Sequence, residues 1–267
     1  MTLIRTLRRR LGDVARWLGL HPSHAKLEAA KTEALADFDG MLDLLLNQAK
    51  VPPEAAKGQL KQDIAALVCN GFKRDGYFVD IGAADGIYSS NTAMLEGVFG
   101  WDGICAEANP HFQAHLRANR RCAVDDRCVW TTTGETLSFH FAHDTLLSTL
   151  SDFVDCDHHA AAREPADVGT VKTVSLNDLL VTHGAPSHVD FLSIDTEGSE
   201  LAILEAFDFS TTSFGFICVE HNYAANREPI KTLLTRKGYR RIWTQLSQWD
   251  DWYIPDGPSV ASKPQGV

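Results

Sequence analysis

The stretch "YFVDIGAADGIYSSNT", residues 77–92, places two carboxylates beside a glycine turn. Asp80 ends an apolar run, Gly82 and Gly86 stand four positions apart, and Asp85 precedes the second glycine. A strand that leads through a tight glycine turn into a helix often binds a nucleotide. Here the spacing is G-x-x-x-G, and the two acids would repel a pyrophosphate. The turn therefore favours a ligand with a cationic end, such as S-adenosylmethionine (SAM), which has an ammonium, a sulfonium and no phosphate.

A third carboxylate, Glu107, ends the next apolar run, "GWDGICAE", 21 residues after Gly86. A carboxylate at the tip of a second strand can accept hydrogen bonds from both hydroxyls of a ribose. The two stretches together would hold the methionine end and the ribose of one ligand. The structural alternatives are an ordinary tight turn at the glycines and an exposed strand-end acid at Glu107.

Polar residues also follow two later apolar runs. "SIDTEGSE" contains Asp195 and Glu197, and "CVEHN" contains Glu220 and His221. A sulfonium ligand such as SAM can donate its methyl group in line to a nucleophile, which then needs a group to take up its proton. These strand ends could supply a general base, with His221 the best matched near neutral pH. They could instead form an Mg²⁺ or Mn²⁺ site from Asp195, Glu220 and His221. Glu197 as a helix cap and His221 as a structural polar residue are the alternatives.

From Tyr77 onward, short apolar runs alternate with helical stretches. Near-continuous apolar strands separated by helices indicate a mostly parallel sheet buried on both faces. The expected strands are "YFVDIG", "DGICAE", "VDFLSID" and "GFICVEH", and the expected helices cover 90–98, 110–118, 200–206 and 227–237. "GYRRIWTQLSQWDDWYIP" has room for two strands and no intervening helix, so the second strand should be antiparallel to its neighbour. The sequence thus predicts an α/β, Rossmann-like fold with helices on both faces.

Three other segments complete the expected elements. A helix should cover residues 54–68, ahead of the first strand, and "VKTVSLNDLLVTHG" should form a strand followed by a short helix. Between Asp144 and Gly169 the periodic patterns fail. We expect a long loop or partly helical insertion there, covering the site of the methyl acceptor.

These motifs, in this order, resemble the FkbM-type family of SAM-dependent methyltransferases over about residues 77–254. The resemblance rests on "FVDIGAADGIYSSNT", "GWDGICAEANP", "VDFLSIDTEGSELAIL" and "ICVEHN". It implies a class I methyltransferase sheet and O-methylation, commonly of sugar or polyketide-like hydroxyls. The implied SAM-binding residues are Asp80, Gly82, Ala83, Asp85, Gly86 and Asn91 at the methionine end, Glu107 and Ala108 at the ribose, and Asp126 of "DDRCVW" at the adenine. Asp195, Glu197, Glu220 and His221 remain the catalytic candidates.

The chain divides into three expected parts. They are an N-terminal helical extension over 1–55, a SAM-dependent methyltransferase domain over 56–255, and a disordered tail over 256–267. In the extension, apolar residues spaced 3, 4, 3 and 4 form one helical stripe: Ile4, Leu7, Leu11, Val14 and Leu18. Such a stripe predicts packing in a core or a homo-oligomer. The arginines around it leave a peripheral contact with an anionic membrane as the alternative.

Composition limits the partners and the location. A formal net charge of −10 argues against broad binding to nucleic acid, which needs a basic face. No apolar run approaches the roughly 20 residues of a membrane span, and the N-terminus lacks the apolar core of a signal peptide. The six cysteines form no C-x-x-C pair, which favours reduced thiols. We expect a cytoplasmic enzyme with a small-molecule or glycan acceptor, peripheral membrane contact being the alternative location.

Two other functions remain open at this point. An NAD(P)-dependent Rossmann oxidoreductase would call for G-x-G-x-x-G and a neutral turn, and this sequence has neither. A non-catalytic SAM-fold interaction module would keep the strands and lose the polar strand ends, whereas "IDTEGSE" and "VEHN" retain them.

Overall fold

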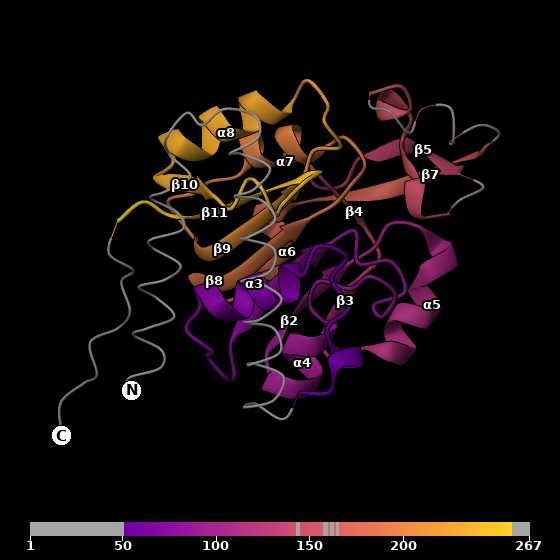
Figure 1. Cartoon of the computed structure of the whole chain (residues 1–267). Coiled ribbons are helices and arrows are strands. Elements are labelled where there is room, and N and C mark those ends of the chain that lie inside the picture. Colours follow the sequence, from indigo (N-terminus) through magenta and orange to yellow (C-terminus); the bar gives the residue numbers. More distant parts are fainter. Residues whose placement is uncertain (1–50, 143–144, 157–159, 161–162, 164–165, 258–267) are drawn as a thin grey trace, which may run out of the picture.

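The computed structural model describes residues 51–257, apart from 143–144, 157–159, 161–162 and 164–165 (Figure 1). The apolar stripe of the N-terminal extension and the tail from residue 258 lie outside the described residues. The division into three parts, the oligomer and the membrane contact therefore stay predictions. Among the described residues, no helix combines the length and hydrophobicity needed to cross a membrane.

A seven-stranded sheet forms the centre of the molecule, in the order β10-β11-β9-β8-β1-β2-β3 (Figure 1). Its strands are β1 Tyr77–Ile81, β2 Asp102–Ala106, β3 Ala123–Asp125, β8 His188–Ile194, β9 Ser213–Glu220, β10 Tyr239–Ile242 and β11 Asp250–Pro255. All neighbours pair in parallel except β11, which is antiparallel to both β9 and β10. The predicted sheet, mostly parallel with one antiparallel C-terminal strand, is confirmed.

Helices cover both faces of this sheet. They are α3 Gln62–Cys69, α4 Ala93–Phe99, α5 Pro110–Asn119, α6 Leu176–Thr182, α7 Glu200–Ala206 and α8 Arg227–Arg236. Successive strand residues point to opposite faces, so Phe191 joins the core that contains α3, α4 and α5, while Leu192 joins the core that contains α6, α7 and α8. The sheet is therefore buried on both sides, which explains the near-continuous apolar runs in its strands.

The helix predicted over 54–68 is wrong in its first half, because α3 begins only at Gln62. A short 3₁₀ helix, η1 Pro53–Ala55, comes first, and Lys61 then adopts a left-handed conformation with φ +66°. The carboxylate of Asp63 accepts hydrogen bonds from the backbone N–H groups of Lys57 and Gly58. These side-chain to backbone bonds stabilise a turn in place of the expected helical start.

A second, four-stranded sheet has the order β4-β7-β5-β6, with β4 Cys128–Trp130, β5 Thr136–Ala142, β6 Thr149–Leu150 and β7 Ala166–Ser175. It includes two pieces, β6 and the start of β7, of the segment 144–169 that we expected to be a loop or partly helical insertion. The strand and short helix predicted in "VKTVSLNDLLVTHG" are confirmed as the end of β7 and α6. Two short 3₁₀ turns, η2 Thr145–Leu147 and η3 Ser151–Phe153, flank β6. Phe139, Leu150 and Val171 are buried together in a small core of its own. Figure 1 shows β5 and β7 beside the central sheet.

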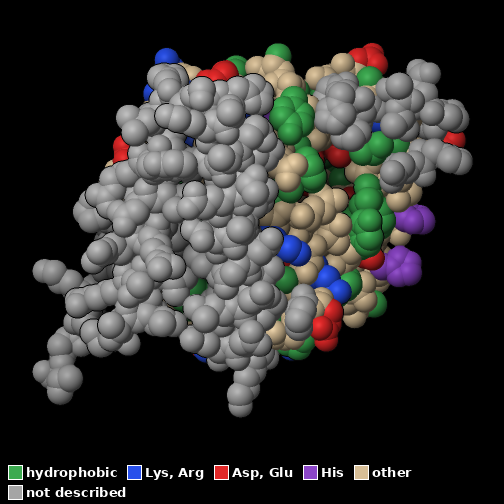
Figure 2. All heavy atoms as spheres, in the orientation of Figure 1, with side chains coloured by type: hydrophobic (Ala, Val, Ile, Leu, Met, Phe, Trp, Pro, Cys, Tyr) green, Lys and Arg blue, Asp and Glu red, His purple; other side chains and the backbone are tan. Residues whose placement is uncertain are grey.

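The face shown in Figure 2 has no region of predominantly basic or predominantly acidic side chains among the described residues. There, the Lys and Arg side chains of the described residues are scattered among acidic and apolar ones. The absence of a nucleic-acid partner and the cytoplasmic location stay predictions.

One ion pair is buried between α4 and the end of α5. Arg120 donates to a carboxylate oxygen of Glu96, and both residues are 6% exposed. Glu96 also accepts hydrogen bonds from the backbone N–H groups of Arg121 and Cys122. Glu96 is therefore the carboxylate that forms a direct ion pair with the guanidinium of Arg120, and removing one partner of a buried pair leaves the other charge poorly compensated.

We predict that Glu96→Gln destabilises the fold by about 3 kcal/mol, because the amide keeps the shape of the side chain and loses its charge. Urea unfolding measures the difference. Glu205→Gln, the same change at an exposed position of α7, is the matched control and should stay within about 0.5 kcal/mol of the parent protein. Equal stability of the two variants would show that the buried pair contributes nothing.

Candidate active site

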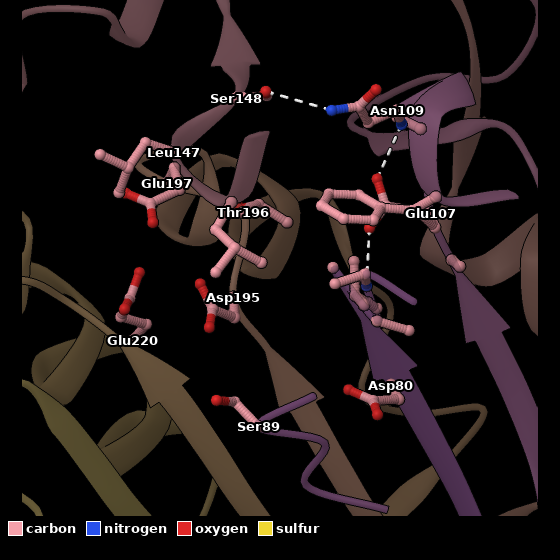
Figure 3. Close-up of a pocket in the computed structure, with 18 of the residues that line it drawn as sticks. Asp80, Ser89, Glu107, Asn109, Leu147, Ser148, Asp195, Thr196, Glu197 and Glu220 are labelled. Atoms are coloured by element: carbon pink, nitrogen blue, oxygen red, sulfur yellow. Dashed lines mark hydrogen bonds between the residues drawn. The ribbon is translucent and has the colours of Figure 1, made fainter. Parts of the chain in front are cut away.

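A cavity of about 470 Å³ lies at the carboxyl ends of β1, β2, β8 and β9, with residues of the second sheet on its other side (Figure 3). In open α/β sheets, ligands bind at this edge. The predicted site residues that line the cavity are Asp80, Gly82, Ala83, Asn91, Glu107, Ala108, Asp195, Glu197 and Glu220. Four others, Asp85, Gly86, Asp126 and His221, do not line it.

The loop after β1 is held tightly against its two neighbouring strands. The N–H groups of Gly82 and Ala83 donate to the carbonyl oxygen of Ala106, at 2.9 and 3.2 Å. Gly82 has φ +83°, and a Cβ at this position would lie 1.8 Å from the carbonyl oxygen of Asp195. Only glycine fits, so this residue sets the distance between the loop and the end of β8.

Asp80 anchors the far side of the same loop. Its Oδ2 accepts a 2.6 Å hydrogen bond from the hydroxyl of Thr92, which in turn accepts one from Arg120 at 3.0 Å. Burial raises the pKa of Asp80, while these partners lower it. Close by, the amide nitrogen of Asn91 donates to the hydroxyl of Ser193 on β8. The loop and the start of α4 are thus fixed to the strand ends before any ligand arrives.

Glu107 projects from the tip of β2 into the cavity (Figure 3). One carboxylate oxygen accepts from the N–H of Ala84 at 2.9 Å and the other from the N–H of Asn109 at 2.7 Å. Burial raises the pKa of this carboxyl to about 7. Each carboxylate oxygen has a second lone pair, so Glu107 can still accept hydrogen bonds from two hydroxyls of a ligand.

Three carboxylates meet at the ends of β8 and β9. One oxygen each from Asp195, Glu197 and Glu220 lies within 4.8 Å of the others (Figure 3). Burial raises the pKa of Asp195 to about 7. Burial and the neighbouring charge of Asp195 hold the pKa of Glu220 well above its usual range. Glu197 lies 2.6 Å from the guanidinium of Arg163.

This arrangement matches the region recognised by a family model. The model of the methyltransferase FkbM domain matches residues 80–249, which include the loop after β1, Glu107 and all three clustered carboxylates. The chain belongs to the FkbM methyltransferase family. An oxidoreductase or a non-catalytic module is therefore disfavoured, and the fold is that of a class I methyltransferase.

Three solved structures to which this FkbM-family chain is similar are the following. A methyltransferase FkbM from Methylobacillus flagellatus KT has 14% identity and a TM-score of 0.42, over 82% of this chain and 60% of that one. A precorrin-6y C5,15-methyltransferase from Geobacter metallireducens GS-15 has 14% identity and a TM-score of 0.38, over 72% and 85%. A putative RNA methyltransferase from Pyrococcus horikoshii has 12% identity and a TM-score of 0.38, over 75% and 83%. No curated protein matches the chain.

His221 does not take the position expected of a general base in this FkbM-family protein. Glu220, the last residue of β9, lines the cavity, whereas His221 lies just beyond the strand, with its Nε2 3.7 Å from a carboxylate oxygen of Asp251. Its Nδ1 accepts a hydrogen bond from the N–H of Tyr223. Burial lowers the pKa of His221 to about 4. The imidazole is neutral near pH 7, and its placement gives it a structural role. Glu197 takes the third position in the cluster.

The other three residues outside the cavity also have structural partners. Asp85 accepts hydrogen bonds from the N–H groups two and three residues later and so closes the turn. A Cβ on Gly86 would lie 2.6 Å from the side chain of Leu116, so this glycine allows α5 to pack closely. Asp126 lies at the surface, paired with Arg117 at 2.9 Å. These three residues do not line the cavity, and their role in SAM binding stays a prediction.

Two features of the site were missed from the sequence. Arg163, fully buried, belongs to the segment that we expected to be a loop. Tyr88 and Tyr223 line the cavity and are each 62% exposed. Arg163 could have been noticed as an arginine within an acidic, His-rich segment. Tyr88 and Tyr223 could have been noticed because each follows closely on a strand-end motif.

We predict that Gly82→Ala destabilises the protein by at least about 2 kcal/mol and abolishes binding of the methyl donor, because the methyl group collides with the main chain of Asp195. Urea unfolding and calorimetry with SAM measure the two effects. Gly97→Ala on α4 is the control, since a Cβ there meets nothing within 4 Å. It should stabilise the helix by roughly 0.5–1 kcal/mol. A Gly82→Ala variant that binds SAM normally would contradict the close approach.

Proposed function

We propose that this protein transfers a methyl group from SAM to a hydroxyl oxygen of a sugar, glycan or related natural product. The observation that carries the proposal is the placement of carboxylates around one cavity. Glu107 and Asp80 lie at the tips of β2 and β1, and the cluster of Asp195, Glu197 and Glu220 lies at the tips of β8 and β9. The first group suits the methyl donor, and the second suits a hydroxyl that must be activated.

The chemistry of the cavity fits SAM. Its volume of about 470 Å³ lies within the range of small-molecule sites. The carboxylate of Glu107 matches a ribose, while Asp80, beside the loop after β1, matches a cationic amino acid end. When bound, SAM supplies an electrophilic methyl group on a sulfonium. The chain's own residues position the ribose and the methionine end and exclude water from the transfer.

The acceptor side is bounded by the clustered carboxylates and by exposed aromatic rings. As the new O–CH₃ bond forms and the S–CH₃ bond breaks, the hydroxyl must release its proton. We assign that release to the clustered carboxylates of Asp195, Glu197 and Glu220. Tyr88 and Tyr223 offer exposed aromatic faces at the cavity. Aromatic faces of this kind favour an acceptor with an apolar ring face, and this supports a sugar or polyketide-like molecule.

We predict that SAM affinity rises about tenfold between pH 6 and pH 8. The raised pKa of Glu107, about 7, means that its carboxylate is mostly protonated at the lower pH and mostly ionised at the higher one. Only the ionised form accepts hydrogen bonds from both ribose hydroxyls. Calorimetry across this pH range measures the effect.

Glu107→Gln tests the assignment of that pH dependence. The variant should bind SAM more weakly by roughly 1–3 kcal/mol at pH 8 and lose the dependence on pH. Glu205→Gln on the exposed face of α7 should behave like the parent protein. A pH dependence that persists in Glu107→Gln would assign it to another group.

A screen with methyl-labelled SAM tests the reaction itself. Glycans, nucleotide sugars and small phenols are offered as acceptors, with Mg²⁺ and with a chelator. We expect the label on a hydroxyl oxygen, and Asp195→Asn should lower kcat by about 10²-fold or more while the Kd for SAM changes less. Label found only on nitrogen or carbon would overturn the proposed oxygen acceptor.

A further inference from the structure

The carboxylate cluster at the ends of β8 and β9 carries more negative charge than its neighbours balance. Among the described residues, Arg163 is the one cation that forms an ion pair with the cluster, and it pairs with Glu197 at 2.6 Å. No Lys, Arg or His side chain of the described residues forms an ion pair with Asp195 or Glu220. When both are ionised, Asp195 and Glu220 therefore leave two negative charges without a counter-charge among the described residues. The cluster therefore calls for a cationic occupant.

An independent feature of Glu220 points to a ligand at the same place. The residue is 9% exposed, and its Oε2 is buried without a hydrogen-bond partner among the described residues. A buried carboxylate oxygen that accepts nothing is unfavourable, and most such atoms in proteins have a partner. Figure 3 shows the carboxyl groups of Glu220, Asp195 and Glu197 turned toward one another across the cavity.

The fold holds Glu197 over the strand ends at some energetic cost. Glu197 has φ +58°, a left-handed conformation that is strained for a residue with a side chain. Two groups of the second sheet region hold it in place. The hydroxyl of Thr149 donates to its carbonyl oxygen at 2.9 Å, and Arg163 donates to its carboxylate. Strain maintained by such specific contacts indicates that the position of this carboxylate matters.

We propose that Asp195, Glu197 and Glu220 bind one divalent cation of the Mg²⁺ and Mn²⁺ class. All three donors are carboxylate oxygens, which hard cations prefer. This set of ligands includes neither a thiolate nor an imidazole, the groups that are typical of zinc sites. A cation of charge +2 also balances the two uncompensated charges. His221, in the metal set expected from the sequence, is replaced by Glu197.

The role of this cation rests on the proposed methyl transfer. A hydroxyl bound to the cation has a lower pKa, because the positive charge stabilises the alkoxide. Its proton passes to water, its oxygen forms the new O–CH₃ bond, and the S–CH₃ bond breaks to give S-adenosylhomocysteine. The residues of the cluster thus hold the cation, and the cation holds the acceptor oxygen.

The direct test measures Mn²⁺ binding to the full chain without SAM, from the loss of the free-ion signal in electron paramagnetic resonance. We expect one Mn²⁺ per chain, displaced by excess Mg²⁺. Glu220→Gln should weaken binding roughly 10–100-fold. Glu205→Gln, the same change outside the cluster, should leave it unaltered. Wild-type binding no tighter than that of Glu220→Gln would overturn the site.

Thermal melting provides a second readout that does not depend on turnover. Mn²⁺ should raise the Tm of the parent protein and leave that of Glu220→Gln unchanged. Without metal, the Tm of Glu220→Gln should be no lower than that of the parent protein, because the substitution removes a repelling charge. A Tm in this range also shows that the variant folds. If a proton shared by Asp195 and Glu220 already neutralises the cluster, Mn²⁺ will shift neither Tm, and the proposal fails.

Separate SAM titrations distinguish this proposal from the proposed function. A parent protein that binds SAM and methylates an acceptor in the presence of a chelator, without binding Mn²⁺, retains the function and loses the metal site. A protein that binds Mn²⁺ at the cluster and fails to bind SAM retains the metal site and loses the function.

Discussion

The loop after β1 passes so close to the end of β8 that only a glycine fits between them. A Cβ on Gly82 would lie 1.8 Å from the carbonyl oxygen of Asp195. From this contact the loop runs to Ala84, whose N–H donates to Glu107 on β2. The same contact therefore sets where Glu107 lies relative to Asp195. The two halves of the cavity, one suited to the methyl donor and one to the acceptor, have a fixed spacing because of it.

Buried acids elsewhere near the cavity have the hydrogen bonds that burial requires. Glu200 accepts from the N–H groups of Thr196 and Gly198, and Asp250 accepts from Gln62. Both carboxyls have a pKa raised by burial, yet each has donors that offset part of the cost. Glu220 differs, because one of its oxygens has no donor among the described residues. Stability alone would favour removing such a charge, so its presence is better explained by function than by folding.

Most of the central sheet was predictable from the sequence because its signals are local. β1, β2, β8 and β9 are apolar runs with an acid at or next to their carboxyl end, and the missing helix between the last two strands required an antiparallel pair. The start of α3 was not predictable in this way, since the left-handed turn at Lys61 depends on the side chain of Asp63. In the second sheet only the end of β7 was predicted, because β5 pairs with β7 across a long sequence separation. Such pairings leave little local trace.

The site was predictable where chemistry follows position along a strand, and not where it depends on side-chain direction. Asp80, Glu107 and Asp195 were found because strand ends meet at one edge of the sheet. His221 was misplaced because it lies one residue beyond the end of β9, with its imidazole next to Asp251. Asp126 lies outside the cavity for a related reason: it follows β3 and turns to the surface, where it pairs with Arg117. Neighbouring residues in a sequence motif can therefore have unrelated roles.

The second sheet links the shape of the cavity to its chemistry. η2 and β6 contribute cavity-lining residues such as Leu147 and Leu150, which limit the space for an acceptor. The same region supplies Thr149, which holds the backbone of Glu197. Ser148, on the donor side, accepts a hydrogen bond from Asn109, the residue whose N–H donates to Glu107. A change in this region that admits a different acceptor would therefore also move the carboxylates on both sides of the cavity. The second sheet therefore contributes to the position of the carboxylates as well as to the wall of the cavity.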